Sequence, residues 1–331
     1  KVLLGGTLPA GGITVRFAPG RYEVRETIAF DRNDSGEEGK RIVYRAEQPG
    51  TVILTGGKNI EPRDVKAITS AELRTRFAGA VVGELREINL KELGVTNYGR
   101  INEAGFLRNY RNPGLELFID DVAFEISRYP NKGYVPVGKV NDKGSIPRRG
   151  DKDNRPGIFK YTDSRPDNWK GSGDIYVSGI FSAPWAPDTI RVARFDKANK
   201  TIYLSRPHHY GIKSGNEYLN YYYKNVLEEV DMSGEYYIDR EKGILVCYPH
   251  GPINAETTIE VSLLEGDLLS LVEASHLTFQ GLIIQAARGV GIRMQNTVNN
   301  LIEGCTVRNV GNVGVVMTGK GNGVLSTDVY N

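Results

Sequence analysis

The chain has 331 residues, of which 40% are hydrophobic and 25% are charged, and its formal net charge is +2 at pH 7. This composition is ordinary for a folded protein with a sizeable core, and no block of like charge indicates the basic stripe that nucleic-acid binding needs. No run approaches the 18 or more apolar residues of a membrane-spanning helix, so we expect no nucleic acid and no membrane insertion. Two cysteines, Cys247 and Cys305, are too few to indicate a disulfide framework or a metal site.

The N-terminal part predicts short β-strands separated by turns. Apolar residues alternate or cluster without a helical period, and Pro19-Gly20 and Pro49-Gly50 are turn signals between the runs. The expected strands are residues 13–17, 22–24, 27–30, 41–46 and 52–54.

Residues 61–262 break this pattern and predict a large β-rich insertion. One helix is expected over residues 70–77, and the loop of residues 139–167 is rich in Gly, Pro and charged side chains, which predicts exposure. Strands are expected at residues 189–193, 201–204, 236–238 and 243–246, with a hairpin turn between the last two.

The C-terminal part contains a repeat of 22 to 23 residues. Phe279–Ile284 aligns with Ile302–Val307, and Val324–Val329 begins a third copy. Each unit consists of short strands separated by Gly and Asn, and it cannot bury its apolar face alone. Stacked coils of a parallel β-helix bury a continuous core, and asparagines at equivalent turns form a hydrogen-bonded ladder. A leucine-rich repeat has a similar period, but its Leu spacing is absent.

Motifs in order along the chain resemble glycoside hydrolase family 141, a family of bacterial β-helix proteins. Each motif is weak alone, and their combination is fairly specific. They are Pro19–Tyr22, Asp34–Gly36, Val43–Ala46, Leu54–Gly57, Ser127–Asn131, Pro207–Gly211, Asn225–Asp231 and Gly234–Arg240. The resemblance covers nearly the whole chain. It implies α-L-fucosidase or xylanase activity on plant polysaccharides and a longer protein, with the catalytic aspartates in later coils.

Four candidate substrate-binding residues come from two short segments. Trp185 lies between prolines that stiffen its loop, so an exposed indole there is a sugar platform, whereas a buried one is a core plug. His208 and His209 are two of only four histidines, and with Tyr210 they either line a cleft or serve as hydrogen-bonded structural groups. Adjacent histidines on a strand point to opposite faces, which argues against a shared metal.

Three further candidates also have two interpretations. Arg128 binds a sugar or its carboxylate, or braces the insertion through an ion pair. Tyr222 and Glu229 belong to an aromatic run with nearby acids, which forms a sugar-binding wall or seals the insertion against the coils. Glycoside hydrolysis needs two carboxyl groups, and the sequence alone does not identify them, so the catalytic residues stay unassigned.

The sequence therefore predicts an all-β, right-handed parallel β-helix interrupted by a large β-rich insertion. The expected division is coils in residues 1–60, the insertion in residues 61–262, and coils in residues 263–331 that continue beyond the chain. The favoured function is hydrolysis of complex plant or microbial polysaccharide by a secreted or periplasmic, monomeric, bacterial enzyme without a cofactor. Two alternatives stay open. One is a polysaccharide lyase with an Arg or Lys base and calcium, using Arg128 or the basic loop of Lys143, Arg148 and Arg149; the other is a non-catalytic glycan-binding protein.

Overall fold

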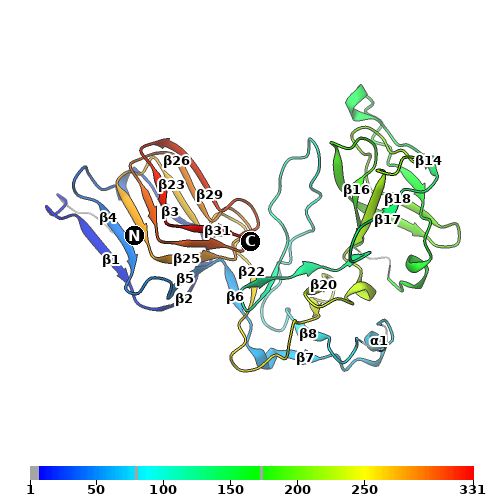
Figure 1. Ribbon diagram of the computed structural model, residues 1–331, viewed down its shortest axis with the longest axis horizontal. Coiled ribbons are helices and arrows are strands. Elements are labelled where there is room, and N and C mark those ends of the chain that lie inside the picture. The colour runs from blue at the N-terminus through cyan, green and yellow to red at the C-terminus, as the bar shows by residue number, and fades with distance from the viewer. Residues whose placement is uncertain (1–6, 78, 80, 172–173) are drawn as a thin grey trace. The chain divides into compact units, whose positions relative to one another are not determined.

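The computed structural model describes residues 7–77, 79, 81–171 and 174–331. The chain divides into two compact units (Figure 1). Unit 1 comprises Lys1–Pro62, Asn112–Ala123 and Glu256–Asn331, and unit 2 comprises Arg63–Arg111 and Phe124–Ala255. Residues 112–123 and 256–262, which the sequence analysis assigns to the insertion, therefore pack with the coils.

Unit 1 is built from three parallel sheets, in which strands distant in sequence are direct neighbours. Sheet A has the order β1 (Ile13–Phe17), β4 (Ile42–Ala46), β24 (Leu277–Gln280), β27 (Leu301–Glu303), β30 (Gly323–Leu325). Sheet B has the order β2 (Gly20–Glu23), β5 (Val52–Thr55), β25 (Leu282–Gln285), β28 (Thr306–Arg308), β31 (Asp328–Tyr330). Sheet C has the order β3 (Ile28–Phe30), β23 (Leu269–Val272), β26 (Ile292–Val298), β29 (Val315–Lys320).

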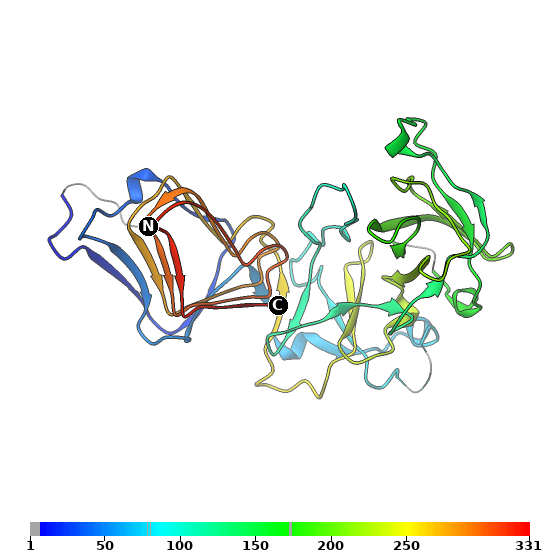
Figure 2. The same cartoon turned by 45° about the horizontal axis from the view of Figure 1, so that its top comes forward.

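The chain visits the sheets in the repeating order A, B, C, so each coil contributes one strand to each sheet, except that the last coil contributes only β30 and β31 (Figure 2). Phe279 pairs with Ile302 and Ile302 with Val324, which is the register that the sequence repeat predicts. Because paired positions have the same side-chain orientation in a parallel ladder, the apolar residues of every coil point into one continuous core. The predicted all-β parallel β-helix is confirmed.

The core of the coils is an interior stack of large side chains. Tyr44 and Phe279, on adjacent strands of sheet A, stack with ring centroids 5.3 Å apart, and Phe30 packs edge-on against both rings. Asn300 forms a step of the expected asparagine ladder, since its Oδ1 accepts from the Leu277 N–H at 2.8 Å. The Asn322 Oδ1 accepts from the Asn300 N–H at 3.0 Å in the same way. These amides satisfy backbone groups at turns that the sheets leave unpaired.

The insertion leaves the coils after β5 and returns before β23, so it interrupts a single coil between sheets B and C. A small antiparallel sheet of unit 1, which we call the corner sheet, combines one strand before unit 2, two strands between its two parts and one strand after it. Its order is β10 (Val122–Ala123), β9 (Leu117–Ile119), β22 (Ile259–Ser262), β6 (Gly57–Asn59).

Unit 2 contains two further sheets. The larger one has the order β12 (Arg128–Tyr129), β19 (Asn220–Lys224), β16 (Tyr176–Ile180), β17 (Pro187–Asp196), β18 (Thr201–Leu204), β15 (Ile158–Lys160), β14 (Val140–Asp142), and β13 (Val135–Pro136) also pairs with β19. The smaller one has the order β11 (Glu125–Ile126), β20 (Glu235–Asp239), β21 (Ile244–Cys247), β8 (Arg86–Asn89), β7 (Val65–Ala67). The predicted hairpin is the antiparallel pair of β20 and β21.

Helices are short throughout the described part of the chain. The expected helix over residues 70–77 is only α1 (Ala71–Arg74), which the Ser70 side chain caps by accepting from the Leu73 N–H. The 3-10 helices are η1 (Arg32–Asp34), η2 (Pro62–Asp64), η3 (Pro147–Arg149), η4 (Arg165–Asn168) and η5 (Leu227–Glu229). No helix among the described residues has the length and apolar character to cross a membrane.

Candidate functional site

Trp185 lies in a tight turn immediately before β17, and 66% of its surface is exposed. The turn is fixed because the Ala186 N–H donates to the Ala183 carbonyl at 2.9 Å. On the C-terminal side of Trp185, the Pro187 carbonyl accepts from the Phe106 N–H at 3.0 Å. The indole therefore projects into solvent from a backbone that is held on both sides.

His208 is fully buried behind this turn, where both ring nitrogens have backbone partners. Its Nε2 lies 3.1 Å from the Ala186 carbonyl, and its Nδ1 lies 2.9 Å from the Gly211 carbonyl oxygen and 3.2 Å from the Tyr210 nitrogen, so a neutral ring donates to one of the two carbonyls. Burial lowers the pKa of His208, which favours the neutral ring. The side chain thus ties the turn carrying Trp185 to the segment carrying Tyr210.

Tyr210 and Phe106 place two more aromatic rings at this position. Their centroids are 6.0 Å apart, and 36% of Phe106 is exposed. The neighbouring Leu107 has a positive φ of 60° and is 63% exposed, which is an unfavourable conformation for a branched apolar residue. We call Phe106, Trp185 and Tyr210 the aromatic surface.

A buried ion-pair cluster around Asp188 holds the segments that carry Phe106 and Trp185. Asp188 accepts from Arg206 through both carboxylate oxygens, at 3.0 and 3.1 Å, and from Arg108 at 3.0 Å. Gly105 forms an isolated bridge with Asp188, and a Cβ at Gly105 would collide with the carboxylate. The glycine therefore allows the loop that carries Phe106 to approach Asp188 closely.

Arg128 and Tyr222 form a separate pair in unit 2. The Arg128 guanidinium lies 3.9 Å from the centroid of the Tyr222 ring, and it donates to the carbonyls of Pro130 and Gly133 at 3.0 and 2.9 Å. Two of its five N–H donors are therefore used within the protein, and the face of the guanidinium is covered by the ring. The geometry is that of a brace between β12 and the loop that follows it.

Glu229 lies in η5 of unit 2, apart from both the aromatic surface and the pair of Arg128 and Tyr222. Its carboxylate has no solvent exposure and accepts from Arg165 at 2.8 and 3.0 Å and from the Trp169 Nε1 at 2.5 Å. Burial raises the pKa of Glu229, while the hydrogen bonds from Arg165 and Trp169 oppose the shift. The sequence pattern did not indicate either partner, because both lie about 60 residues earlier in the chain.

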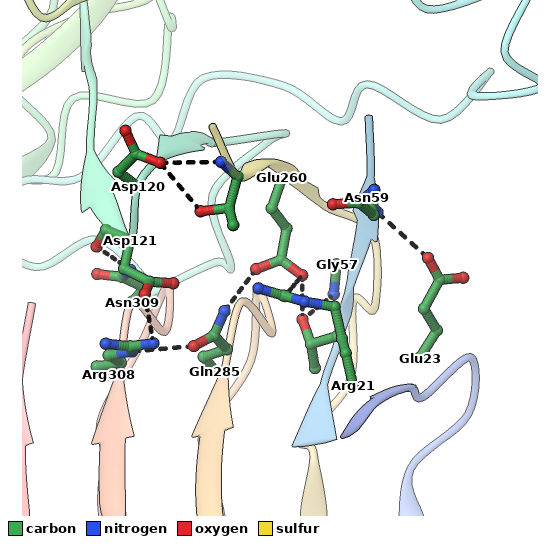
Figure 3. A network of polar contacts seen from close by, with 12 residues as sticks. Arg21, Glu23, Gly57, Asn59, Asp120, Asp121, Glu260, Gln285, Arg308 and Asn309 are labelled. Atoms are coloured by element: carbon green, nitrogen blue, oxygen red, sulfur yellow. Dashed lines mark hydrogen bonds and ion pairs between the residues drawn. The ribbon is translucent and has the colours of Figure 1, made fainter. Parts of the chain in front are cut away.

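Unit 1 has a polar row that sequence reasoning missed, on the outer side of sheet B (Figure 3). Thr55, Gln285 and Arg308 occupy paired positions on successive strands. Glu260 of β22 covers the row: its carboxylate accepts from Arg21 at 2.7 Å, from Thr55 at 2.5 Å and from Gln285 at 2.7 Å. All the polar contacts of this carboxylate are thus directed at the coils, where they join the corner sheet to sheet B.

The row continues to a partly exposed carboxylate, which Figure 3 shows at its other end. Arg308 donates to the Gln285 Oε1 at 2.9 Å and pairs with Asp121 at 2.8 Å. The Asp121 side chain is 37% exposed, in contrast to that of Glu260, which is 4% exposed. Asp121 is therefore the member of the row with a carboxylate that a solute can reach.

Glu116, just before β9, has the electrostatics of a proton donor. Burial raises its pKa to about 7, and the positive charge of Arg288 opposes the shift. Its Oε2 is buried without a hydrogen-bond partner among the described residues. Arg288 is itself buried and lies 3.7 Å from the exposed carboxylate of Glu265. One guanidinium thus acts on two carboxyl groups of different environment, and such a difference can separate an acid from a base.

The described residues contain no group of three or more His, Cys, Asp or Glu side chains placed to hold a metal ion. A cavity of about 210 Å³ in unit 2 is lined partly by Leu73, Arg76, Tyr237 and Lys242. This volume is below the roughly 300–1,000 Å³ of typical ligand sites, so the cavity does not accommodate an oligosaccharide.

No protein-family model matches the sequence, and no curated protein is significantly similar to it. A solved structure described as a glycoside hydrolase superposes with a TM-score of 0.60 at 14% identity, over 91% of this chain and 60% of that chain. The chain thus spans about 60% of the length of that protein. At this identity the match shows a shared fold.

Two other structures match less well. The complex of XylC with xylose gives a TM-score of 0.39 at 8% identity, over 96% of this chain and 49% of that one. The Gp54 tailspike of Acinetobacter baumannii bacteriophage AP22, in complex with capsular saccharide, gives 0.18 at 9% identity, over 96% and 41%. Both scores are too low to bear on the fold.

Proposed function

We propose that this chain is part of a glycoside hydrolase that acts on complex plant or microbial polysaccharide. The observation that carries the proposal is the aromatic surface, above all the exposed indole of Trp185 on its fixed turn. Aromatic faces pack against the apolar C–H faces of sugar rings, and a rigid platform loses little conformational entropy on binding. Exposed indoles are otherwise disfavoured on a protein surface.

The fold is consistent with this proposal, because a β-helix gives a long and rigid outer face on which a polymer can lie. The structural match described as a glycoside hydrolase supports hydrolysis of a glycan. The similarity of the sequence motifs to family 141 supports α-L-fucosidase or xylanase-like chemistry. Such substrates lie outside the cytoplasm, and we accordingly propose a secreted or periplasmic location.

Hydrolysis of a glycosidic bond needs one carboxyl group that donates a proton and another that attacks or activates water. In the coils, Glu116 has a pKa raised by burial and Glu265 is an exposed carboxylate beside Arg288, so the two acids have the different environments that this division of roles needs. Within the proposal, they and Asp121 are the carboxyl groups of this chain to test first. Further acids from coils outside this chain remain part of the proposal.

Binding can be measured through the two tryptophans, because Trp185 is exposed and Trp169 is 1% exposed. We expect xylo-oligosaccharides or fucosylated oligosaccharides to protect Trp185 from acrylamide quenching. Trp185→Ala should remove this protection and weaken binding by at least about tenfold, since buried aromatic anchors dominate binding energy. Tyr134→Ala, which removes another exposed ring of unit 2 (57% exposed), is the control and should bind normally.

Turnover distinguishes the proposal from its two alternatives. Release of reducing ends without an unsaturated, ultraviolet-absorbing product supports hydrolysis. Release of the unsaturated product supports a lyase. Binding without either product, in the full-length protein, supports a non-catalytic role, and no binding to any glycan contradicts all three.

A further inference from the structure

The loop that precedes β15 lies against the segment that carries Tyr210. The Arg148 N–H donates to the His209 carbonyl at 3.0 Å, and the Ile212 N–H donates to the Lys143 carbonyl at 2.9 Å. Gly211 packs against Ile146 of the same loop. The basic loop of residues 143–149 is therefore held beside the aromatic surface by backbone hydrogen bonds on both sides of Tyr210.

The positive charges of this loop are not neutralised within the protein. Lys143, Arg148 and Arg149 are exposed, and none of them forms an ion pair or side-chain hydrogen bond with a described residue. Residues 142–155 contain five basic and three acidic side chains. One acid, Asp142, already pairs with Arg155 at 3.0 Å, and another, Asp151, accepts from backbone N–H groups of its own loop.

His209, next to Tyr210 in the chain, lies close to the positive charges of Arg108 and Arg148. Burial lowers its pKa first, and the positive charges of Arg108 and Arg148 lower it further, while no carboxylate acts in the opposite direction. Its Nε2 is buried and has no hydrogen-bond partner among the described residues. Burial disfavours charge of either sign, but the contributions of Arg108 and Arg148 show that both positive charges lie close to this position, where they favour an anion.

We propose that the aromatic surface, together with Arg148, binds glycans that carry a carboxylate, such as chains with uronic acid residues. This inference rests on the proposed function and names the class of substrate for it. Trp185 stacks on the sugar ring, and the planar guanidinium of Arg148 donates two parallel N–H groups to the carboxylate. Arginine is suited to this task because its fork matches the two oxygens, whereas lysine offers only a point charge.

The test compares xylo-oligosaccharides of equal length with and without a glucuronosyl branch, by titration calorimetry on the full chain. We expect the branched ligand to bind at least about fivefold more tightly at low salt, and the preference to shrink as salt rises. Arg148→Ala should abolish the preference and leave the neutral ligand unaffected. Arg148→Lys should restore only part of it.

Arg63→Ala, which removes an exposed arginine in η2, is the matched control and should preserve the preference. If the wild type binds both ligands with equal affinity and Trp185→Ala binds neither, the carboxylate proposal is overturned, and the proposal that the aromatic surface binds glycans stands. A sulfated oligosaccharide that binds more tightly than the uronate, with the same dependence on Arg148, would replace carboxylate by sulfate. No binding of either xylo-oligosaccharide overturns both proposals.

Discussion

Glu229 shows how a single carboxylate can be fully engaged inside the protein. Three hydrogen bonds from Arg165 and Trp169 surround it, and none of its surface is exposed. A buried charge of this kind adds little net stability compared with an apolar pair, but it is costly to break, because the partner is left uncompensated. Its position in the sequence, beside a run of tyrosines, suggests substrate contact; its surroundings indicate a structural contact.

We therefore expect Glu229→Gln to destabilise unit 2 while glycan binding persists in the folded protein. Because the Arg165 side chain is 42% exposed and can be solvated, the cost should be about 2–3 kcal/mol, below that of a wholly buried pair. Urea denaturation measures it. Glu217→Gln, at an exposed position, is the control and should change the free energy of unfolding by less than about 0.5 kcal/mol. Loss of binding in folded Glu229→Gln would instead make this residue part of the site.

Glu116 should make stability depend on pH. Its folded pKa of about 7 lies above the unfolded value of 4.5, so between these values only the unfolded chain loses the proton. The free energy of unfolding should therefore fall as pH rises through this window, by up to about 3 kcal/mol, and should level off above it. Glu116→Gln should remove this contribution, whereas Glu265→Gln, at an exposed carboxylate, should retain it. Parallel pH profiles of the wild type and Glu116→Gln would contradict the raised pKa.

At this scale the sequence identifies residue types better than their environments. Proline on both sides of Trp185 indicates a stiff turn, and the indole is exposed as a platform requires. The partners of Arg128 and Glu229 come from segments distant in sequence, so no local pattern separates a brace from a ligand. For the same reason, the polar row of Thr55, Gln285 and Arg308 cannot be recognised before the register of sheet B is known.

Among the elements, the asparagine turns connect one coil to the next. The Asn300 side chain is buried, accepts from Leu277 N–H and donates to the Ala274 carbonyl at 3.0 Å. We expect Asn300→Ala to cost about 2–3 kcal/mol, because two backbone groups lose their partner inside the protein. Gln295→Ala, on the exposed side of β26, should be nearly neutral in the same thermal denaturation assay. Similar melting temperatures for the two variants would mean that water replaces the ladder.

The elements that are predictable from sequence are those that repeat. Strands β1 to β5 and the repeats from Phe279 onward follow apolar alternation, and the 22- to 23-residue offset gives their register directly. The corner sheet is different, because β9 and β22 are uniformly buried and pair with strands across the insertion. β9 is a run of three apolar residues without a period, and the alternation of β22 does not indicate its partner strands, so residues 112–123 are not recognisable as part of the coils.

For the whole molecule, the two units contain separate hydrophobic cores, one around Ile284 in the coils and one around Ile190 in the larger sheet of unit 2. Both isoleucines are fully buried, so Ile→Ala at either position should cost about 2–5 kcal/mol. We expect calorimetry to show two transitions, with Ile284→Ala lowering one and Ile190→Ala lowering the other. A single transition that both variants shift equally would mean that the units unfold together.

The placement of the insertion within one coil has a kinetic consequence. Ile28 of β3 pairs with Leu269 of β23, so sheet C begins with a contact of very high sequence separation, whereas later coils pair with neighbours only about one repeat away. Contacts of high contact order form slowly, because the loop-closure entropy is lost before the contact is gained. During synthesis on the ribosome, the first strands therefore wait, with apolar edges open, until unit 2 has emerged. Aggregation of the nascent chain and dependence on chaperones should be greatest in that interval.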